Sequence, residues 1–498
     1  MSERVLVIGA GMAGLCTALA LAPTGREVVL LERDPSPPPG DADEAFRDWN
    51  RRGVGHLRHS HAFLARLRSL IRDEHRPLLD DLLASGCREI TFAEMLTDLH
   101  KPRYQPKPID ADMVVLTSRR TTLELIMRRY VERLPGVSIR PETFVRELVV
   151  ETPADRPLAV TGVRLEDGEV LSADLVVDAA GRTSGACEQL RALGAPIAEV
   201  SESAGILYFT RHYRLRPGQA EPPRGKNPAS GDMGYMKFGV FPADNGCFSI
   251  TICVPEIEFE MRKAILDPEV FDRLCREIPG LVPWLETERT EGVSKVFGMG
   301  DLHSRWRDLV TDGKPAVTGF FALGDGLVRT NPLYGRGCSF AAVSAYQLRD
   351  TLAESADPAA RALRYHERIQ AEIRPYYDNM LEQDRAAVRR ARQTLTPGYK
   401  PSFRSRMTKS FLEDGLNIAV RSDPELMREA LRSFHMLEHP SAWLRRPKNL
   451  AKVMGYWAKG KRANAAAYPP KLGPEREALY TALGVSPTAD IERLAAEG

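Results

Sequence analysis

Three glycines near the N-terminus have the type and spacing needed to hold a phosphate group. Gly9, Gly11 and Gly14 follow the apolar run 5–8 in a GxGxxG arrangement. In this arrangement the first glycine permits a tight turn, the second lets the backbone approach a pyrophosphate, and the third lets the following helix pack closely on the strand. Glu32 ends a second apolar run, where its carboxylate can accept hydrogen bonds from a ribose diol and would repel a 2′-phosphate. The pattern predicts dinucleotide binding, disfavours NADP, and leaves NAD and FAD open.

Two later segments repeat the pattern of an apolar strand that ends in an acid and a glycine turn. The first, 175–184, reads LVVDAAGRTS and contains Asp178. The second, 319–326, reads GFFALGDG, contains Asp325, and is followed by NPLYGRG and the helical run 338–352. An acid at the tip of such a strand can accept hydrogen bonds from sugar hydroxyls. A helix that begins at glycines presents free N–H groups to negative charge.

Taken in order, these three motifs resemble those of the flavoprotein monooxygenase superfamily, which has the glutathione-reductase type of FAD fold. The resemblance runs from the N-terminus to the helical run 338–352. It implies an α/β fold with a Rossmann-like FAD-binding domain, a mixed-sheet substrate domain and a helical C-terminal region. Flavin-dependent halogenases and geranylgeranyl reductases share part of the pattern.

The resemblance also implies roles for single residues. Asp325 would accept hydrogen bonds from the ribityl chain of FAD, the helix that begins at Gly335 and Gly337 would face the pyrimidine edge of the flavin, and Pro332 would lie flat against the ring. The backbone of Val145 would contact the adenine. The full set of predicted FAD-binding residues is Gly9, Gly11, Met12, Ala13, Gly14, Glu32, Arg33, Arg58, Arg120, Val145, Asp178, Gly181, Gly324, Asp325, Pro332, Gly335 and Gly337.

A narrower likeness concerns three shorter segments. Segment 53–61 (GVGHLRHSH) is similar to the G-V-P-Q-G-R-H-x-H loop of a bacterial subgroup that includes the olefin epoxidases of polyether antibiotic pathways. Segments 118–124 and 208–213 are similar to the S-R-x-x-L-E and Y-x-T-R-x-Y segments of that subgroup. The likeness implies that Arg58 and Arg120 contact FAD. Gly55, His56 and Leu57 stand where the subgroup has proline, glutamine and glycine. This departure leaves the flavin contacts of the loop open.

The histidines of segment 53–61 allow two other interpretations, a metal site and an ordinary polar loop. No cysteine or carboxylate accompanies them at ligand spacing, and Arg58 lies among them. We therefore expect no metal site.

The middle of the chain predicts a substrate domain. Segments 137–150 and 158–171 indicate strands of a small sheet over the FAD domain, and 205–255 contains long alternating runs. Tyr208, Tyr235 and Phe238 are predicted to form an apolar wall of the substrate pocket, with ordinary core packing as the alternative. The expected division is 1–190 and 301–390 for the FAD-binding domain, 191–300 for the substrate domain and 391–498 for the helical C-terminal region.

Composition limits the class of protein. The chain has 69 basic and 67 acidic residues, a net charge of +2, which excludes a general nucleic-acid-coating protein. Seven scattered cysteines without CxxC pairing favour reduced thiols in a cytoplasm, and no apolar run reaches the length of a membrane span. Segment 439–474 has eight basic residues and no acid. A solvated basic face is the favoured interpretation of that segment, and contact with an anionic membrane is the alternative.

The function implied by the resemblance is an FAD-dependent monooxygenase of secondary metabolism. Its flavin C4a-hydroperoxide would epoxidise or hydroxylate a hydrophobic small molecule, such as a polyketide, terpenoid or aromatic, with O₂ as co-substrate. Because the sequence has one dinucleotide motif, NAD(P)H would bind transiently or a flavin reductase would supply the electrons. No side chain is predicted to be catalytic, since the flavin does the chemistry. Alternatives are a reductase of isoprenoid double bonds, a halogenase (whose W-x-W-x-I-P signature is absent) and a non-catalytic FAD-binding protein.

Overall fold

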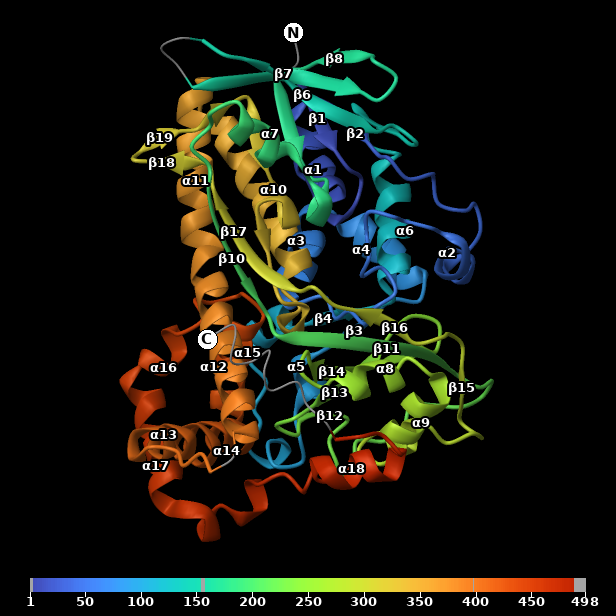
Figure 1. The fold of residues 1–498 in the computed structure, drawn as a ribbon, viewed down its shortest axis with the longest axis vertical. Helices are drawn as coiled ribbons and strands as arrows, with labels where there is room; N and C mark the ends of the chain where they lie inside the picture. The colour runs from blue at the N-terminus through green and yellow to red at the C-terminus, as the bar shows by residue number, and fades with distance from the viewer. Residues whose placement is uncertain (1–2, 154–156, 397, 488–498) are drawn as a thin grey trace.

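A parallel sheet forms the centre of the N-terminal part of the fold (Figure 1). The computed structural model describes residues 3–153, 157–396 and 398–487. The strand order is β21-β9-β1-β2-β5, and the strands are β1 (Arg4–Ile8), β2 (Glu27–Leu31), β5 (Val137–Arg140), β9 (Leu175–Asp178) and β21 (Phe320–Ala322). Their residues are mostly β-branched or otherwise apolar. In β1, β2, β9 and β21 almost all residues are buried, because these strands are covered on both faces of the sheet. The pairing of β21 with β9 joins two distant parts of the chain at the same sheet edge.

Part of one segment was assigned to the wrong sheet by the sequence analysis. Segment 137–150 was expected to belong wholly to the small covering sheet, but β5 pairs with β2 in the parallel sheet, in the register Val28↔Val137. The covering sheet has the order β20-β7-β6, with β8 on β7. Its strands are β6 (Val145–Glu151), β7 (Leu158–Leu165), β8 (Val170–Ser172) and β20 (Val317–Thr318). The backbone of 141–144 separates β5 from β6, so the two strands can join different sheets.

Helices pack around the parallel sheet, and the first of them begins shortly after the carboxyl end of β1. They are α1 (Met12–Leu21), α3 (Ala65–Glu74), α4 (Arg76–Ala84), α6 (Arg120–Val131), α10 (Gly337–Glu354), α11 (Pro358–Glu372) and α12 (Arg374–Leu395). Every residue of α1 is buried, because the helix lies between the sheet and α10. In Figure 1, α11 and α12 follow each other down one side of the molecule, next to β10 (Ala198–Ser203) and β17 (His303–Asp308), which pair antiparallel.

A second, antiparallel sheet lies below the carboxyl edge of the parallel sheet in Figure 1. Its order is β12-β13-β14-β11-β15, with β16 also on β11. The strands are β11 (Ile206–Leu215), β12 (Ser230–Asp232), β13 (Lys237–Pro242), β14 (Cys247–Pro255), β15 (Thr290–Gly292) and β16 (Phe297–Met299). One face packs its apolar side chains against α8 (Phe259–Ala264) and α9 (Pro268–Arg276). The alternation predicted for 205–255 is therefore that of a sheet with two different faces.

The C-terminal part is mainly helical, its last described helix ends at Leu483, and 488–498 lie outside the described residues. Its helices include α13 (Phe403–Ser410), α14 (Asn417–Ser422), α15 (Pro424–Phe434), α17 (Pro447–Ala463) and α18 (Arg476–Leu483). The last of these returns to the antiparallel sheet, where Leu479 and Tyr480 belong to the same core as α9. The predicted α/β fold, with its FAD-type parallel sheet, second sheet and helical C-terminal region, is confirmed.

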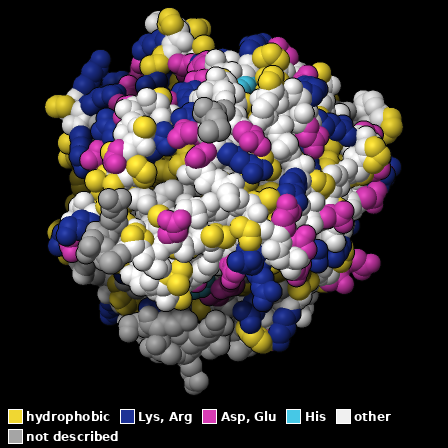
Figure 2. Space-filling view, turned by 90° about the horizontal axis from the view of Figure 1, so that it is seen from above, with side chains coloured by type: hydrophobic (Ala, Val, Ile, Leu, Met, Phe, Trp, Pro, Cys, Tyr) yellow, Lys and Arg dark blue, Asp and Glu magenta, His cyan; other side chains and the backbone are white. Residues whose placement is uncertain are grey.

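The cysteines, the helices and the surface charges bear on the expectations drawn from composition. The cysteines, all within the described chain, are buried free thiols. Among the described residues, no helix combines the length and the hydropathy that a membrane crossing needs. Figure 2, seen from the end where β8 lies in Figure 1, shows basic and acidic side chains interspersed over that face.

Candidate active site

A cavity of about 840 Å³ extends from the carboxyl edge of the parallel sheet to the inner face of the antiparallel sheet. Most of the predicted FAD-binding residues line it, although they come from six separate parts of the chain. Those that line it are Gly9, Gly11, Met12, Ala13, Glu32, Arg33, Arg120, Val145, Asp178, Gly181, Gly324, Asp325, Pro332, Gly335 and Gly337. Gly14 and Arg58 do not line it.

The first glycine motif has the geometry that phosphate binding requires. Gly9 has a φ of +97°, and a Cβ on Gly14 would lie 1.9 Å from the carbonyl oxygen of Gly9, so α1 can pack on β1 only with glycine there. A Cβ on Gly11 would meet nothing within 4 Å. Gly11 is also the N-cap of α1 and offers no side chain to its first amides. The amides at the start of α1 therefore face the cavity without a side-chain cap, as a site for an anion.

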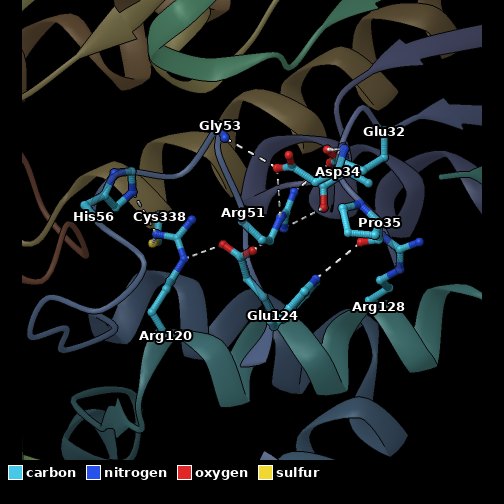
Figure 3. Close-up of polar contacts among 12 residues, drawn as sticks. Glu32, Asp34, Pro35, Arg51, Gly53, His56, Arg120, Glu124, Arg128 and Cys338 are labelled. Atoms are coloured by element: carbon cyan, nitrogen blue, oxygen red, sulfur yellow. Dashed lines mark hydrogen bonds and ion pairs between the residues drawn. The ribbon is translucent and has the colours of Figure 1, made fainter. Parts of the chain in front are cut away.

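A chain of alternating buried charges runs along α6 beneath the cavity (Figure 3). Arg51 donates from Nη2 to Glu32 Oε2 at 2.6 Å and from Nη1 to Glu124 Oε2 at 2.5 Å. Arg120 donates from Nε to the other oxygen of Glu124 at 2.5 Å. Burial alone would raise the pKa of Glu124, but the charges of Arg120 and Arg51 outweigh it and hold the pKa below its ordinary value. The chain of charges thus joins Glu32 to Arg120, and both of these side chains line the cavity.

The sequence analysis missed Arg51 and placed Arg58 in the site instead. The Arg58 side chain donates to the carbonyl oxygens of Phe46, Arg47 and Trp49 at 2.8, 3.2 and 3.1 Å, at the end of α2 (Ala42–Asp48). Arg58 thus holds the loop that carries Arg51, and it is Arg51 that lines the cavity. Arg51 could have been predicted only from the expectation that Glu32, if it is buried, needs a cation near it.

We expect Arg58→Ala to leave FAD affinity within about threefold of wild type while it lowers the unfolding free energy by about 1–3 kcal/mol, because hydrogen bonds from a charged donor are lost. The measurements are FAD titration and denaturant unfolding. Arg47→Ala, which changes an exposed arginine of the same segment, is the matched control. A tenfold or larger loss of FAD affinity in Arg58→Ala would return Arg58 to the cofactor site.

Arg120 also contacts two histidines and a thiol at the beginning of α10. Its Nη1 lies 3.4 Å from His56 Nε2, 3.4 Å from His61 Nε2 and 3.2 Å from Cys338 Sγ. Burial and the charge of Arg120 lower the pKa of His56 to about 3, so this imidazole is neutral and accepts from the guanidinium. In the described chain no group of three or more His, Cys, Asp or Glu side chains is arranged to hold a metal ion.

The acids of the two later motifs, Asp178 and Asp325, differ in the hydrogen bonds that their carboxylates accept. Asp178 accepts from the amide of Ala180 at 3.1 Å and from Ser184 Oγ at 2.6 Å. Asp325 has no hydrogen-bond partner for its carboxylate within the residues that the structure describes, and burial raises its pKa. An acid held in a cavity wall without a donor is a ready acceptor for a ligand hydroxyl.

The loop before α10 is held from behind by a buried polar group. Asn331 donates to Asp384 Oδ1 at 2.9 Å and accepts from the Tyr208 hydroxyl at 2.6 Å. Tyr334 donates to the same Asp384 oxygen at 2.9 Å. These bonds fix the loop that carries Pro332 and Gly335 against α12 and β11.

The residues present fit FAD. The open backbone at Gly11 and the uncapped start of α1 would receive the pyrophosphate, the free carboxylate of Asp325 would accept from the ribityl chain, and the start of α10 would face the flavin.

The far end of the cavity is formed by the antiparallel sheet. Tyr208 and Phe238 line it, but Tyr235 does not, because its hydroxyl donates to the carbonyl of Pro474 at 2.9 Å and its ring packs with the core on the other face. Polar residues that the sequence analysis did not assign to the site also line this end, among them His59, Ser60, Thr210, Ser230, Lys237 and Thr251. Thr210 and Thr251 are polar residues at positions that alternate with apolar ones in β11 and β14, which is a signal that the sequence contains, whereas His59 and Ser60 lie in a loop.

Comparisons with known sequences bear on the class of protein. Residues 4–46 match the family model described as FAD dependent oxidoreductase. Protein Rv3254 of Mycobacterium tuberculosis is 28% identical over 368 residues, which cover 70% of this chain and 73% of that protein.

Solved structures with the same fold are similar at low identity. PqsL, a probable FAD-dependent monooxygenase from Pseudomonas aeruginosa, is 18% identical with a TM-score of 0.53 and covers 78% of this chain and 95% of its own. The myxobacterial chondrochloren halogenase CndH is 18% identical with a TM-score of 0.56 and covers 88% of this chain and 96% of its own. The Diels-Alderase PyrE3 of pyrroindomycin biosynthesis is 17% identical with a TM-score of 0.57, covering 88% and 81%.

The fold is therefore that of FAD-dependent oxidoreductases. The N-terminal match, the shared fold and the cavity support an enzyme of this kind with FAD as its cofactor. The narrower likeness to polyether-pathway epoxidases stays a prediction.

Proposed function

We propose that this protein is an FAD-dependent monooxygenase that epoxidises or hydroxylates a hydrophobic small molecule. The observation that supports this proposal is the continuity of the cavity. One end is lined by the glycine motifs and strand-end acids, and the other by the apolar side chains of the antiparallel sheet, including Tyr208, Phe238 and Phe241. A flavin held at the first end would have its ring next to the second.

The chain's own residues bind, orient and exclude water. When bound and reduced, FAD supplies the activation of O₂. The start of α1 and Asp325 hold the cofactor, and the neutral His56 and His61 accept from Arg120 so that this cation stays fixed beside α10. The antiparallel sheet forms the wall of the far end, where it would keep water away from the bound substrate. Electrons come from NAD(P)H, directly or through a flavin reductase.

The test is oxygen incorporation. The FAD-loaded protein, supplied with reduced flavin and ¹⁸O₂ but no halide, is given polyenes, terpenoids and aromatics in turn. We expect substrate-dependent O₂ uptake and a product that carries one ¹⁸O atom. A product formed only with bromide or chloride would instead indicate a halogenase, a class whose fold this chain shares. Saturation of a substrate double bond without O₂ would indicate a reductase.

A further inference from the structure

The cavity face of the antiparallel sheet carries a narrow polar stripe among apolar residues. In the β11–β14 register, Thr210 lies opposite Thr251 and Tyr208 lies opposite Cys253. Ser249 lies two residues before Thr251 and therefore on the same face. The residues between them, such as Ile250 and Ile252, point into the core on the other face.

The hydroxyls of this stripe form one continuous ladder that ends at a histidine. His59 Nδ1 lies 3.0 Å from Thr210 Oγ1, which lies 2.8 Å from Thr251 Oγ1. Ser60 Oγ lies 2.6 Å from Thr251 Oγ1 and 2.6 Å from Ser249 Oγ. We call these five residues the hydroxyl ladder. His59, Thr210, Thr251 and Ser60 line the cavity, while Ser249 is behind them.

Each hydroxyl has one proton, so the direction of the ladder can be worked out. Burial lowers the pKa of His59 to about 4, so its imidazole is neutral and has one N–H. If Nδ1 accepts, Thr210 donates to it, Thr251 donates to Thr210, Ser60 donates to Thr251, and Ser249 donates to Ser60. If Nδ1 donated, five protons would be available for four bonds, and the spare proton could lie on any of the four hydroxyls. A hydrogen bond to the backbone of Gly298 raises the pKa of His59, which means that the imidazole donates to that carbonyl. Its single N–H is used there, and Nδ1 accepts from Thr210.

With Nδ1 as the acceptor, the hydroxyls that face the cavity spend their protons inside the ladder. Thr210, Thr251 and Ser60 then present only lone pairs to a ligand. Tyr208, Phe241 and Leu302 lie in the same wall, together with Lys237, whose ammonium group pairs with Asp232 at 3.0 Å. A ligand without a donor would cover these acceptors and leave them unsatisfied, which costs free energy.

We propose that the substrate presents a hydrogen-bond donor, a hydroxyl or N–H group, to Ser60 and Thr251, so that it is a phenol- or alcohol-type molecule and not a bare hydrocarbon. This inference rests on the proposed function, in which the substrate occupies this end of the cavity. The hydrogen-bonding groups of the cavity wall thus narrow the proposed substrate from any hydrophobic small molecule to one that carries a hydroxyl or N–H group.

The experiment compares matched ligands on the FAD-loaded full chain. The probes are 2-naphthol and 2-methoxynaphthalene, together with the smaller pair phenol and anisole, and binding is followed through the visible absorbance of the flavin. We expect each hydroxyl compound to bind at least about tenfold more tightly than its methyl ether, the equivalent of one hydrogen bond to a site built for it.

Thr251→Val tests the ladder itself, because valine keeps the β-branched shape without the hydroxyl. The preference is expected to disappear or reverse in this variant, since Ser60 then has a proton free for a methyl ether oxygen. Ser60→Ala is a second variant that leaves the sheet intact. Ser230→Ala, at the edge of the cavity outside the ladder, is the matched control and should keep the wild-type ratio.

Equal affinities in the wild type, binding of none of the four probes, or an unchanged ratio in both ladder variants would overturn the inference. Turnover separates this inference from the proposed function. A protein that prefers the hydroxyl compounds but incorporates no oxygen into any substrate would overturn the proposed function alone. One that oxygenates 2-methoxynaphthalene as readily as 2-naphthol would overturn the donor requirement alone.

Discussion

Replacing Glu124 with glutamine is expected to lower the free energy of unfolding by about 3–5 kcal/mol, because it leaves buried cations without their shared counter-charge. Glu124 is fully buried and accepts from both Arg51 and Arg120. Glutamine keeps the volume but offers one acceptor oxygen and brings an N–H₂ toward a guanidinium. The measurement is denaturant unfolding of the FAD-free protein.

The matched control is Glu132→Gln on the same helix. Glu132 accepts from Arg128 at 3.0 Å, but its side chain is 43% exposed, so its pair is screened by water. The control is expected to change stability by no more than about 0.5 kcal/mol. Similar losses in the two variants would contradict the importance that we give to the buried chain of charges.

The effect of Glu124→Gln should also depend on pH. The folded-state pKa of Glu124 is lowered, so its contribution is complete above the unfolded pKa and is lost as the pH falls through the folded pKa. The difference in stability between wild type and variant is therefore expected to be constant near neutral pH and to narrow below about pH 4. A difference that widens on acidification would contradict this assignment of charge.

Asp325→Ala is expected to weaken FAD binding by about tenfold to a hundredfold, since hydrogen bonds to a charged acceptor are lost. The stability of the FAD-free protein should rise in the same variant. Burial raises the pKa of Asp325, which means that its ionised form costs free energy in the folded state until a ligand supplies donors. FAD titration and unfolding of the FAD-free protein measure the two effects.

Asp350→Ala on α10 is the control for this prediction. Its side chain is 40% exposed and pairs with Arg349 on the surface, away from the cavity. It should change neither FAD affinity nor stability appreciably. If Asp325→Ala destabilised the FAD-free protein, then the carboxylate would have partners in the fold and would not be reserved for the cofactor.

The cradle for the cofactor could be predicted because its requirements are local. Gly9 and Gly14 are demanded by backbone geometry within a single strand–turn–helix. Asp178 ends its strand, and Asp325 lies in the turn that follows β21. Such patterns survive in the sequence whatever surrounds them. The parallel sheet then brings the motifs together, because the carboxyl ends of its strands share one edge.

The polar partners in the site could not be predicted in the same way. Arg51 and Arg58 lie in one loop, and nothing in their spacing shows which of them faces the cavity. The loop folds so that Arg58 binds backbone carbonyls at the end of α2 and Arg51 enters between Glu32 and Glu124. Tyr235 and Tyr208 were likewise assigned to the same wall, but the sheet turns them to opposite faces.

The sequence by itself determined the α/β class, the dinucleotide motif and most of the residues that surround the cofactor cavity, since each depends on neighbours a few positions away. Only the tertiary structure decided the alternation of charges along α6 and the hydroxyl ladder. The ladder joins residues 59–60 to β11 and β14, and its acceptors meet because Thr210 pairs with Thr251 in the register of two antiparallel strands. Register and loop path are set by packing across the whole chain, which local patterns do not record.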